Sequence, residues 1–423
     1  MNDISKIREL IASLRKDETL PYRDNLMYIT YGPKTINGIE TDEYGLIFHV
    51  KEKKPVDALQ IEKIIPASIA VEDISIVTDV ETGMVYNHTI GNCHTLSDII
   101  EPVMSTRIRQ RTIRGGSSSI AKVDNGYVAT MGLLVRDKSD GQIVALSNNH
   151  VFAGSSLHPA YTSTYSNVHS LCAIQPAYEA YGSVDRASDV IGTCKKFVPV
   201  GDETYTLIGS YIGGTTSDSA ILALSTYNVI DSDSSKIIGF DPLPPYQFAT
   251  DAEIDSLLDT SSVNYAAPLF RSGRTCGPVG YPGNTYSCQI SCYEFGDAIV
   301  GRYSGKTSYF LDSFWFRGRG NIAAGRGGDS GSAVLALLSS TMSTASAWKV
   351  IGLLFAGPED STYSIGCRIT SIVQKLDIAP WNTIMPTVSA TYKTMVIAPL
   401  NYTTLQDSCY ITLSGRKYFY VGK

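Results

Sequence analysis

The chain opens with a helical pattern of apolar residues. Five of them recur at three- and four-residue spacing: Ile4, Ile7, Leu10, Ile11 and Leu14. This spacing places one apolar stripe along a helix, and Asn2 or Asp3 is available as its cap. The pattern therefore predicts a short amphipathic helix at the start of the chain.

Strand patterns follow within residues 1–82. Residues 26–31 and the alternating run 44–50 flank a Gly-containing turn near Asn37, which predicts a strand pair. A helical stretch is expected near residues 57–64, and a further strand is expected at residues 74–80. Together these elements predict an α/β module.

From about residue 115 the pattern changes to short apolar or alternating runs separated by Gly, Asn, Asp and Ser turns. These runs cover residues 127–135, 143–146, 191–198, 219–224, 311–316, 332–338 and 349–355. Many short strands at this spacing predict an all-β barrel or sandwich.

The strand-rich region is interrupted once. Residues 226–262 hold a Pro-rich segment at Pro242–Pro245 and a capping box from Thr250 to Glu253, which predicts a helix through Leu258. Two β units of comparable size, joined by a linker, are therefore expected. In the tail, runs at residues 410–413 and 418–421 predict a hairpin.

These patterns divide the chain into six segments. They are the α/β module 1–82, a connector 83–114, a first β unit 115–235, a linker with a short helix 236–262, a second β unit 263–380 and a C-terminal β extension 381–423.

The charge balance narrows the classes of function. Lys and Arg number 35 against 41 Asp and Glu, which gives a formal net charge of -6. Because no basic field concentrates phosphates, no nucleic-acid or membrane-surface partner is expected. Residues 1–18 are too charged for the apolar core of a signal peptide, and no later run suits a transmembrane helix. A cytoplasmic protein is expected, and association with a virion is compatible with these features.

The chain has eight cysteines: Cys93, Cys172, Cys194, Cys276, Cys288, Cys292, Cys367 and Cys409. Without a secretory signal we expect free thiols in a reducing compartment. Cys288 and Cys292 would share one face of a strand and with Cys276 could hold a metal. Buried thiols that pack as small apolar residues are the simpler interpretation, so no metal or cofactor is expected.

The most informative run for chemistry precedes an apolar strand and reads GGDSGSAV, with Ser330 at its centre. A serine hydroxyl becomes a nucleophile only when a base takes its proton, and the resulting oxyanion needs fixed donors. Glycines before the serine let successive N–H groups point into one concavity. By itself the run is equally compatible with a Gly-Ser turn before a strand.

Two further residues supply possible partners for this serine. His150 follows a strand in the first β unit, where a general base would lie, and Asp218 precedes an apolar strand, where a carboxylate can orient an imidazole. Either residue alone also fits a structural role, His150 in a core and Asp218 as a turn cap. Together with Ser330 they predict one triad divided between the two β units.

The motifs SNNHV, SDSAIL and GGDSGSAV, in this order, resemble those of the chymotrypsin/trypsin-like serine peptidases. The resemblance is to the microbial branch, in which Gly-Ser follows the serine. Residues 129–132, 272–275 and 350–357 agree with that branch, and the N-terminal module resembles an extension that many of these proteins carry. The resemblance covers about residues 20–380 and implies two six-stranded antiparallel β-barrels of the chymotrypsin type.

The resemblance also implies the role of each residue. Ser330 would be the nucleophile, His150 the general base and then the general acid, and Asp218 the residue that orients the imidazole. The backbone N–H groups of Gly328 and Ser330 would form the oxyanion hole.

The substrate pocket is implied in the same way. Ala324 would form its floor, with Gly325 next to it and the run Phe355, Ala356 and Gly357 on the opposing wall. Because no carboxylate stands at this floor, cleavage after Lys or Arg is disfavoured. A hydrophobic or small side chain before the scissile bond is expected.

Asp329 raises a question of activation. In the animal branch of the family, the Asp before the serine pairs with a new N-terminus made by zymogen cleavage. Here more than a hundred residues precede the β units, and no such terminus is evident. Asp329 is therefore expected to be satisfied in another way, or the oxyanion hole waits for an activating event.

The sequence as a whole predicts a mainly β serine endopeptidase that acts on a protein or peptide through an acyl-enzyme. Two alternatives stay open. One is a structural or assembly protein on a protease-like fold, such as a phage or virion component. The other is a protease that cleaves only itself or one partner. Assembly of several copies through the N-terminal module or the tail is compatible with each.

Overall fold

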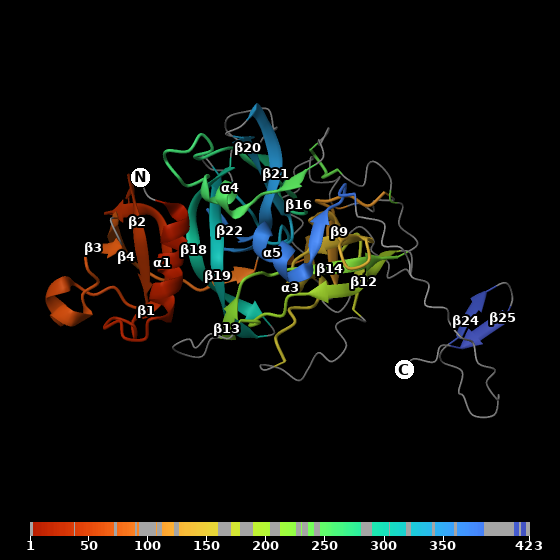
Figure 1. Cartoon of the computed structure of the whole chain (residues 1–423). Helices are drawn as coiled ribbons and strands as arrows, with labels where there is room; N and C mark the ends of the chain where they lie inside the picture. Colours follow the sequence, from red (N-terminus) through yellow and green to blue (C-terminus); the bar gives the residue numbers. More distant parts are fainter. Residues whose placement is uncertain are drawn as a thin grey trace. The chain divides into compact units, whose positions relative to one another are not determined.

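The computed structural model describes most of the chain (Figure 1). The described residues are 3–37, 39–71, 74–88, 91–92, 107, 112–121, 127–159, 171–177, 189–203, 212–225, 230, 236–240, 246–280, 290–303, 305–318, 323–340, 343–358, 362–384, 410–413 and 416–419. The chain divides into two compact units, residues 1–383 and 384–423. The fold is mainly β, as the strand patterns predict.

Helix α1 (Ile4–Lys16) confirms the expected N-terminal helix. Asp3 is its cap, because its carboxylate accepts hydrogen bonds from the N–H groups of Ser5 and Lys6. Ile7 and Ile11 are fully or almost fully buried, so the apolar stripe faces the core. The cap and the stripe together explain why this segment is helical.

The first strands form the expected hairpin. Strands β1 (Leu26–Ile36) and β2 (Ile39–Val50) pair in antiparallel fashion. Strand β4 (Ile74–Thr82) lies parallel to β2, and β3 (Ser68–Val71) pairs antiparallel with β4.

The helix expected near residues 57–64 is wrong in type. The segment contains two short 3₁₀ turns, Val56–Ala58 and Ile61–Lys63, with no buried residue in either. The segment is short, stands between Pro55 and Pro66, and has no apolar face against a core. A helix this short is not stable without such packing.

The sheet of the N-terminal residues continues into the second β unit. Strand β1 pairs antiparallel with β18 (Ile290–Tyr303), with Thr30 opposite Gly296. The result is one 14-stranded sheet in the order β13-β19-β22-β21-β20-β16-β18-β1-β2-β4-β3, with β5, β15 and β17 off this path.

The strands of this sheet that follow β4 are β5 (Tyr86–His88), β13 (Ile212–Thr215), β15 (Gln247–Phe248), β16 (Leu269–Gly273), β17 (Gly277–Gly280), β19 (Lys306–Gly318), β20 (Ala333–Ser340), β21 (Ser343–Gly357) and β22 (Tyr363–Arg368). Antiparallel pairs join β16 to β18, β18 to β19, β19 to β22, β22 to β21, β21 to β20 and β20 back to β16. The sheet curls into a half-barrel.

A second, ring-like sheet is built from strands of the first β unit together with β6 of the connector and β23 of the second β unit. Its strands are β6 (Gly91–Asn92), β7 (Ser118–Ala121), β8 (Tyr127–Thr130), β9 (Leu133–Asp137), β10 (Ile143–Ser147), β11 (Cys172–Ile174), β12 (Val190–Phe197), β14 (Ala220–Leu224) and β23 (Ile378–Pro380). They pair in the order β23-β9-β10-β14-β12-β11-β7-β8-β6. The strands expected in both β units are thus confirmed.

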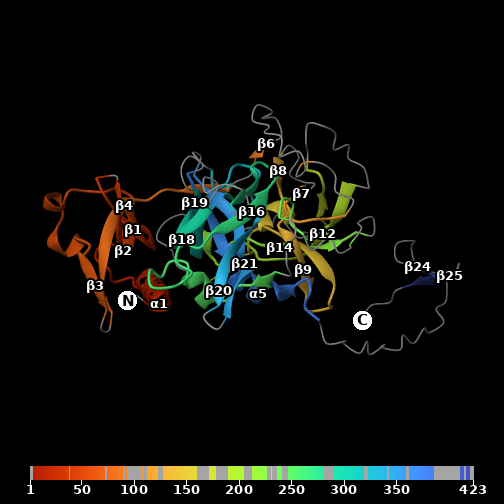
Figure 2. The same ribbon diagram turned by 90° about the horizontal axis from the view of Figure 1, so that it is seen from above.

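The two sheets meet beside Thr130, whose N–H donates to the Ser330 carbonyl at 2.8 Å. Figure 2 shows β16 and β21 of the 14-stranded sheet next to β7, β8 and β14 of the ring-like sheet. The candidate residues of both β units lie at this junction.

Short helices complete the larger unit. They are α3 (Asn149–Phe152), α4 (Asp251–Asp255) and α5 (Ile369–Leu376). The capping box between Thr250 and Glu253 is present, as expected, but the helix ends at Asp255 rather than at Leu258. The Pro-rich run at 242–245 lies outside the described residues.

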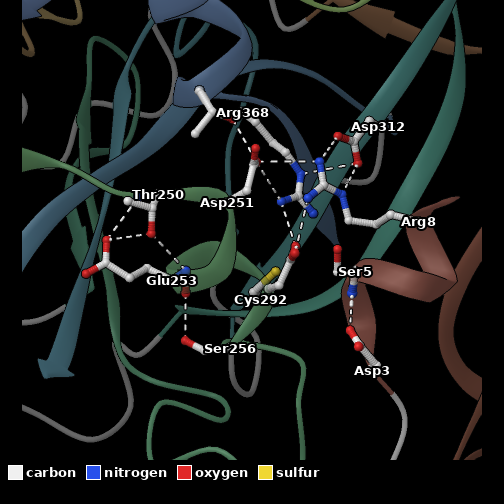
Figure 3. Close-up of polar contacts among 12 residues, drawn as sticks. Asp3, Ser5, Arg8, Thr250, Asp251, Glu253, Ser256, Cys292, Asp312 and Arg368 are labelled. Carbon is white, nitrogen blue, oxygen red and sulfur yellow. Dashed lines mark hydrogen bonds and ion pairs between the residues drawn. The ribbon is translucent and has the colours of Figure 1, made fainter. Parts of the chain in front are cut away.

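An ionic cluster fastens α1 to the body of the larger unit. The guanidinium groups of Arg8 and Arg368 meet between Asp251 and Asp312 (Figure 3). Arg8 and Arg368 also bind opposite oxygens of Asp255, at 3.1 and 2.8 Å. Because Arg8 lies on α1 while its partners lie on α4 and β19, the cluster ties the N-terminus to distant segments.

The tail forms its own hairpin. Strand β24 (Tyr410–Leu413) pairs antiparallel with β25 (Arg416–Phe419), as predicted, although the second strand begins two residues earlier than expected. The intervening residues 414–415 lie outside the described part. Among the described residues, no helix has the length and apolar character needed to cross a membrane.

Candidate active site

The structure brings His150 and Asp218 into direct contact. The imidazole Nδ1 lies 2.5 Å from Asp218 Oδ2, and the His150 N–H donates to Oδ1 at 3.2 Å. Asn148, which precedes α3, donates its amide to the Asp218 carbonyl at 2.7 Å. Both His150 and Asp218 are fully buried. Because Nδ1 is engaged by the carboxylate, proton exchange with a reacting group falls to Nε2.

A tyrosine that the sequence did not single out also binds Asp218. Tyr303, the last residue of β18, donates its hydroxyl to Asp218 Oδ2 at 2.6 Å, and its ring lies 6.1 Å from the His150 ring. Burial, followed by the charge of Asp218, raises the pKa of Tyr303 well above 10. The phenol therefore stays a donor at ordinary pH. A buried tyrosine needs a polar partner, but the sequence does not reveal which one.

Ser330 lies in the turn that leads into β20. Its hydroxyl is 3.4 Å from the Phe355 carbonyl of β21. The next residue, Gly331, has φ +91°, and a Cβ there would overlap Ser147 Oγ and the Thr130 carbonyl. Since Ser147 ends β10 three residues before His150, this close packing places the Ser330 turn beside the strand that leads to His150.

The turn before Ser330 is held by its neighbours. Gly328 has φ +100°, a conformation that residues with a Cβ rarely adopt. Its carbonyl accepts a hydrogen bond from Thr130 Oγ1 at 2.8 Å, and Thr275 Oγ1 donates to the Gly327 carbonyl at 2.6 Å. These bonds fix the orientation of the two peptide units on either side of Gly328.

Asp329 is satisfied by partners within the same β unit. Its Oδ1 accepts from the N–H groups of Thr275 and Cys276 at 2.8 and 3.0 Å, and its Oδ2 accepts from that of Arg326 at 3.0 Å. Arg271 Nη1 lies 3.3 Å from Oδ2, and both side chains are fully buried. Burial lowers the pKa of Arg271, but Asp329 and Cys276 together raise it by more, so the net pKa lies above its ordinary value. Of the two expectations for Asp329, the structure shows the first: it has other partners than a new N-terminus.

Of the residues expected to form the substrate pocket, Phe355 lies next to Ser330, because its carbonyl is 3.4 Å from the Ser330 hydroxyl. Ala324 is fully buried, and its carbonyl accepts a hydrogen bond from Arg271 Nε. A Cβ at Gly325 would stand 2.6 Å from Ser364 Oγ, so this wall leaves no room for a larger residue. Phe355 and Ala356 are also fully buried. Arg271 thus joins the expected pocket floor to the Asp329 turn.

A short strand from the connector pairs with the residues expected to form the opposing wall of the pocket. Strand β5 pairs antiparallel with β21, with His88 opposite Ala356 and Asn87 opposite Gly357. It also pairs in parallel with β18, with Tyr86 opposite Val300. No sequence pattern indicated this strand, because three residues are too few for a periodic signal.

The described cysteines are free thiols, namely Cys172, Cys194, Cys276, Cys292 and Cys367. Burial raises the pKa of the last four to about 12. Cys93, Cys288 and Cys409 lie outside the described residues, so the grouping of Cys276, Cys288 and Cys292 cannot be placed. Within the part of the chain that is described, no three His, Cys, Asp or Glu side chains form a metal-binding group.

Comparison with known proteins adds no relative. No protein-family model matches the chain, and no curated protein matches it. The residues of the site therefore carry the proposal of function by themselves.

Proposed function

We propose that the chain is a serine endopeptidase. The observation that carries the proposal is the buried contact between His150 Nδ1 and Asp218 Oδ2, beside the strand against which the Ser330 turn packs. An imidazole whose Nδ1 is held by a carboxylate exchanges protons with a reacting group through Nε2, and the serine stands on a turn shaped by two glycines in the left-handed region.

The proposed reaction follows from these positions. His150 Nε2 takes the Ser330 proton while Oγ attacks the scissile carbonyl, and Asp218 stabilises the imidazolium that forms. The N–H groups of Gly328 and Ser330 bind the oxyanion, each donor worth about 3 to 4 kcal/mol of transition-state stabilisation. His150 then protonates the leaving amine. In the second half of the reaction His150 takes a proton from water, the water attacks the acyl carbonyl, and His150 returns the proton to Ser330 as the acid product leaves.

The proposed architecture is two six-stranded antiparallel barrels of the chymotrypsin type. The closed series of antiparallel pairs from β16 through β18, β19, β22, β21 and β20 supports it in the second β unit. The antiparallel pairing throughout the ring-like sheet supports it in the first.

The proposed substrate is an extended peptide with a small or hydrophobic side chain before the scissile bond. Ala324 and Gly325 offer no charge to a basic side chain. Gly357, at the end of β21, stands at an edge where β5 pairs in the structure, and a peptide strand could pair at the same edge once β5 is displaced.

The test is covalent labelling of the full chain with a fluorophosphonate probe, read by intact mass. One label per chain is expected in the wild type, and none in Ser330→Ala or His150→Ala. Ser332→Ala is the matched control, because Ser332 is buried in the same turn and should leave labelling intact. Labelling that survives Ser330→Ala would overturn the proposal.

A second candidate function is a protease that acts on its own chain. The observation that favours it is the pairing of Asn87 and His88 with Gly357 and Ala356. An extended substrate would use the same edge, next to the carbonyl that Ser330 Oγ contacts. The chain's own β5 therefore competes with any external peptide, which would hold the site latent until the connector is cut or displaced.

This candidate is tested with Asn87→Pro. Strand β5 lies between two partner strands, so a proline within it removes a ladder hydrogen bond and disfavours the pairing. We expect labelling about five- to tenfold faster than in the wild type, since one lost bond is worth about 1 to 1.5 kcal/mol. Asn87→Ala keeps the backbone N–H and is the matched control.

Mass spectrometry provides the second arm. A self-processing protease yields a connector fragment in the wild type that Ser330→Ala lacks. If wild type and Asn87→Pro are both folded and both unlabelled, the protease proposals fail and a structural or assembly role on this fold becomes the better conclusion.

A further inference from the structure

Tyr303 connects the two β units at the site. It ends β18 of the 14-stranded sheet, whereas Asp218 precedes β14 of the ring-like sheet, so their hydrogen bond crosses between the sheets. The Tyr303 side chain is fully buried, and its ring packs at 5.4 Å from that of Phe310. Phe310 in turn lies 4.5 Å from Phe355, whose carbonyl is next to Ser330 Oγ. The Tyr303 side chain therefore packs against the same strands that position Ser330.

The hydroxyl shares one carboxylate oxygen with the imidazole. Asp218 Oδ2 accepts from Tyr303 at 2.6 Å and from His150 Nδ1 at 2.5 Å, while Oδ1 accepts the His150 N–H. A hydrogen-bond donor to Oδ2 partly neutralises the negative charge on that oxygen. It therefore reduces the attraction between that oxygen and a protonated imidazole, and it also stops the carboxylate from rotating.

We propose that Tyr303 is a positioning residue of the site: its hydroxyl fixes the Asp218 carboxylate against His150 and sets how strongly that carboxylate favours the imidazolium. The inference rests on the proposed function. It goes beyond that function because the third hydrogen-bond donor to the Asp218 carboxylate comes from the second β unit. The contact between His150 and Asp218 therefore has its full set of donors only when both β units are folded together.

The titratable groups beside this hydroxyl include Asp218, His150 and Cys367. The Cys367 thiol, on β22, approaches the Asp218 carbonyl at 3.7 Å. Burial raises the pKa of Cys367 to about 12, so this thiol stays neutral between pH 4 and pH 10. A change in the pH profile over that range therefore reports on the coupled pair.

The experiment compares Tyr303→Phe with Tyr309→Phe. Phe keeps the ring and its packing and removes only the hydroxyl. Tyr309 is the matched control, because it is a buried tyrosine on the adjacent β19 whose hydroxyl donates to a buried aspartate, Asp297, at 3.0 Å. Both variants lose one bond to a carboxylate, but only the first loses it at the site.

The rate of fluorophosphonate labelling is measured from pH 4 to pH 10 on the full chain. In Tyr303→Phe we expect a plateau about tenfold lower, the equivalent of one hydrogen bond, and an acidic limb shifted upward by about half a pH unit. Tyr309→Phe should follow the wild type. A Tyr303→Phe profile that superimposes on the wild type, or an equal shift in both variants, would overturn the inference.

A second readout does not depend on turnover. The His150 Nδ1 proton in a short bond to a carboxylate gives a far-downfield proton NMR signal, whose pH titration midpoint should move in Tyr303→Phe and not in Tyr309→Phe. An unmoved midpoint contradicts the inference even if the site is covered by β5. By contrast, labelling that survives Ser330→Ala overturns the proposed function itself, so the two failures are distinguishable.

Discussion

The Arg271–Asp329 ion pair offers the sharpest test of what holds the turn at Ser330 in its conformation. The perturbation is Arg271→Met, which keeps the length and apolar stem of the side chain and removes its charge. Both partners are fully buried and their nearest charged atoms lie 3.3 Å apart. The substitution leaves a carboxylate without its cation at the residue next to Ser330.

The magnitude follows from that geometry. At an effective dielectric constant of about 20, two unit charges at this separation attract by about 5 kcal/mol. Breaking one side of a buried pair costs about 3 to 5 kcal/mol. Asp329 keeps the N–H donors of Thr275, Cys276 and Arg326, so we expect the lower end, about 3 kcal/mol. If the loss falls wholly on the turn, it corresponds to a fall of about 150-fold in the rate of reaction at Ser330.

The assay pairs urea unfolding with the rate of fluorophosphonate labelling. Arg271→Met should be less stable and should label at least about tenfold more slowly than the wild type. The double variant Arg271→Met/Asp329→Asn removes both charges, and it should recover most of the stability, because replacing a whole buried pair is often nearly neutral. Wild-type stability and labelling in Arg271→Met would refute the claim that this pair holds the turn.

Three further predictions use other parts of the structure. Gly331→Ala should abolish labelling, because its Cβ would overlap neighbouring strand atoms, whereas Gly141→Ala, with φ +73° and open space around it, should cost only about 1 kcal/mol in urea unfolding. Burial raises the pKa of Asp137, but hydrogen bonds from two lysines and a serine lower it by a larger amount, so the net pKa is below 3.8. Its stabilisation is present above the unfolded pKa and is lost as pH falls below about 4, so Asp137→Asn should flatten the acid decline in stability. Arg15→Met should leave Asp297 buried without its cation and expose α1 to limited proteolysis, while a wild-type digestion pattern would contradict this role.

Much of the β structure could be predicted because the signals are local. Short continuous apolar runs mark strands such as β10 and β14, and the capping box at Thr250 marks the start of α4. In the same way, the motifs around His150 and Asp218 stand at strand ends, where side chains can meet at the mouth of a sheet. The structure places these two side chains in contact.

The remaining features depend on partners that are distant in sequence. Arg271 and Tyr303 carry no motif, since each acquires its role only through a carboxylate on another strand. The pairing of β1 with β18, and that of β5 with β21, joins segments whose patterns specify a strand but no neighbour. The wrong prediction after Pro55 has a different cause. The residues there have a helical spacing, but they have no surface to pack against, so only two 3₁₀ turns form.

Strand β18 takes part in several of these contacts between distant segments. Strand β18 pairs with β1 at Gly296, pairs with β5 at Val300 and Gly301, and ends at the tyrosine that binds Asp218. Removal of residues 1–82 would take away β1 and leave part of β18 without a neighbour, but it would keep β5, at residues 86–88, on the edge at Gly357. The loss of β1 loosens the support of Tyr303, while the edge beside Ser330 stays closed to a peptide. Truncation before residue 83 should consequently not speed labelling, whereas Asn87→Pro should, because only the point substitution displaces β5 while keeping β1 in place.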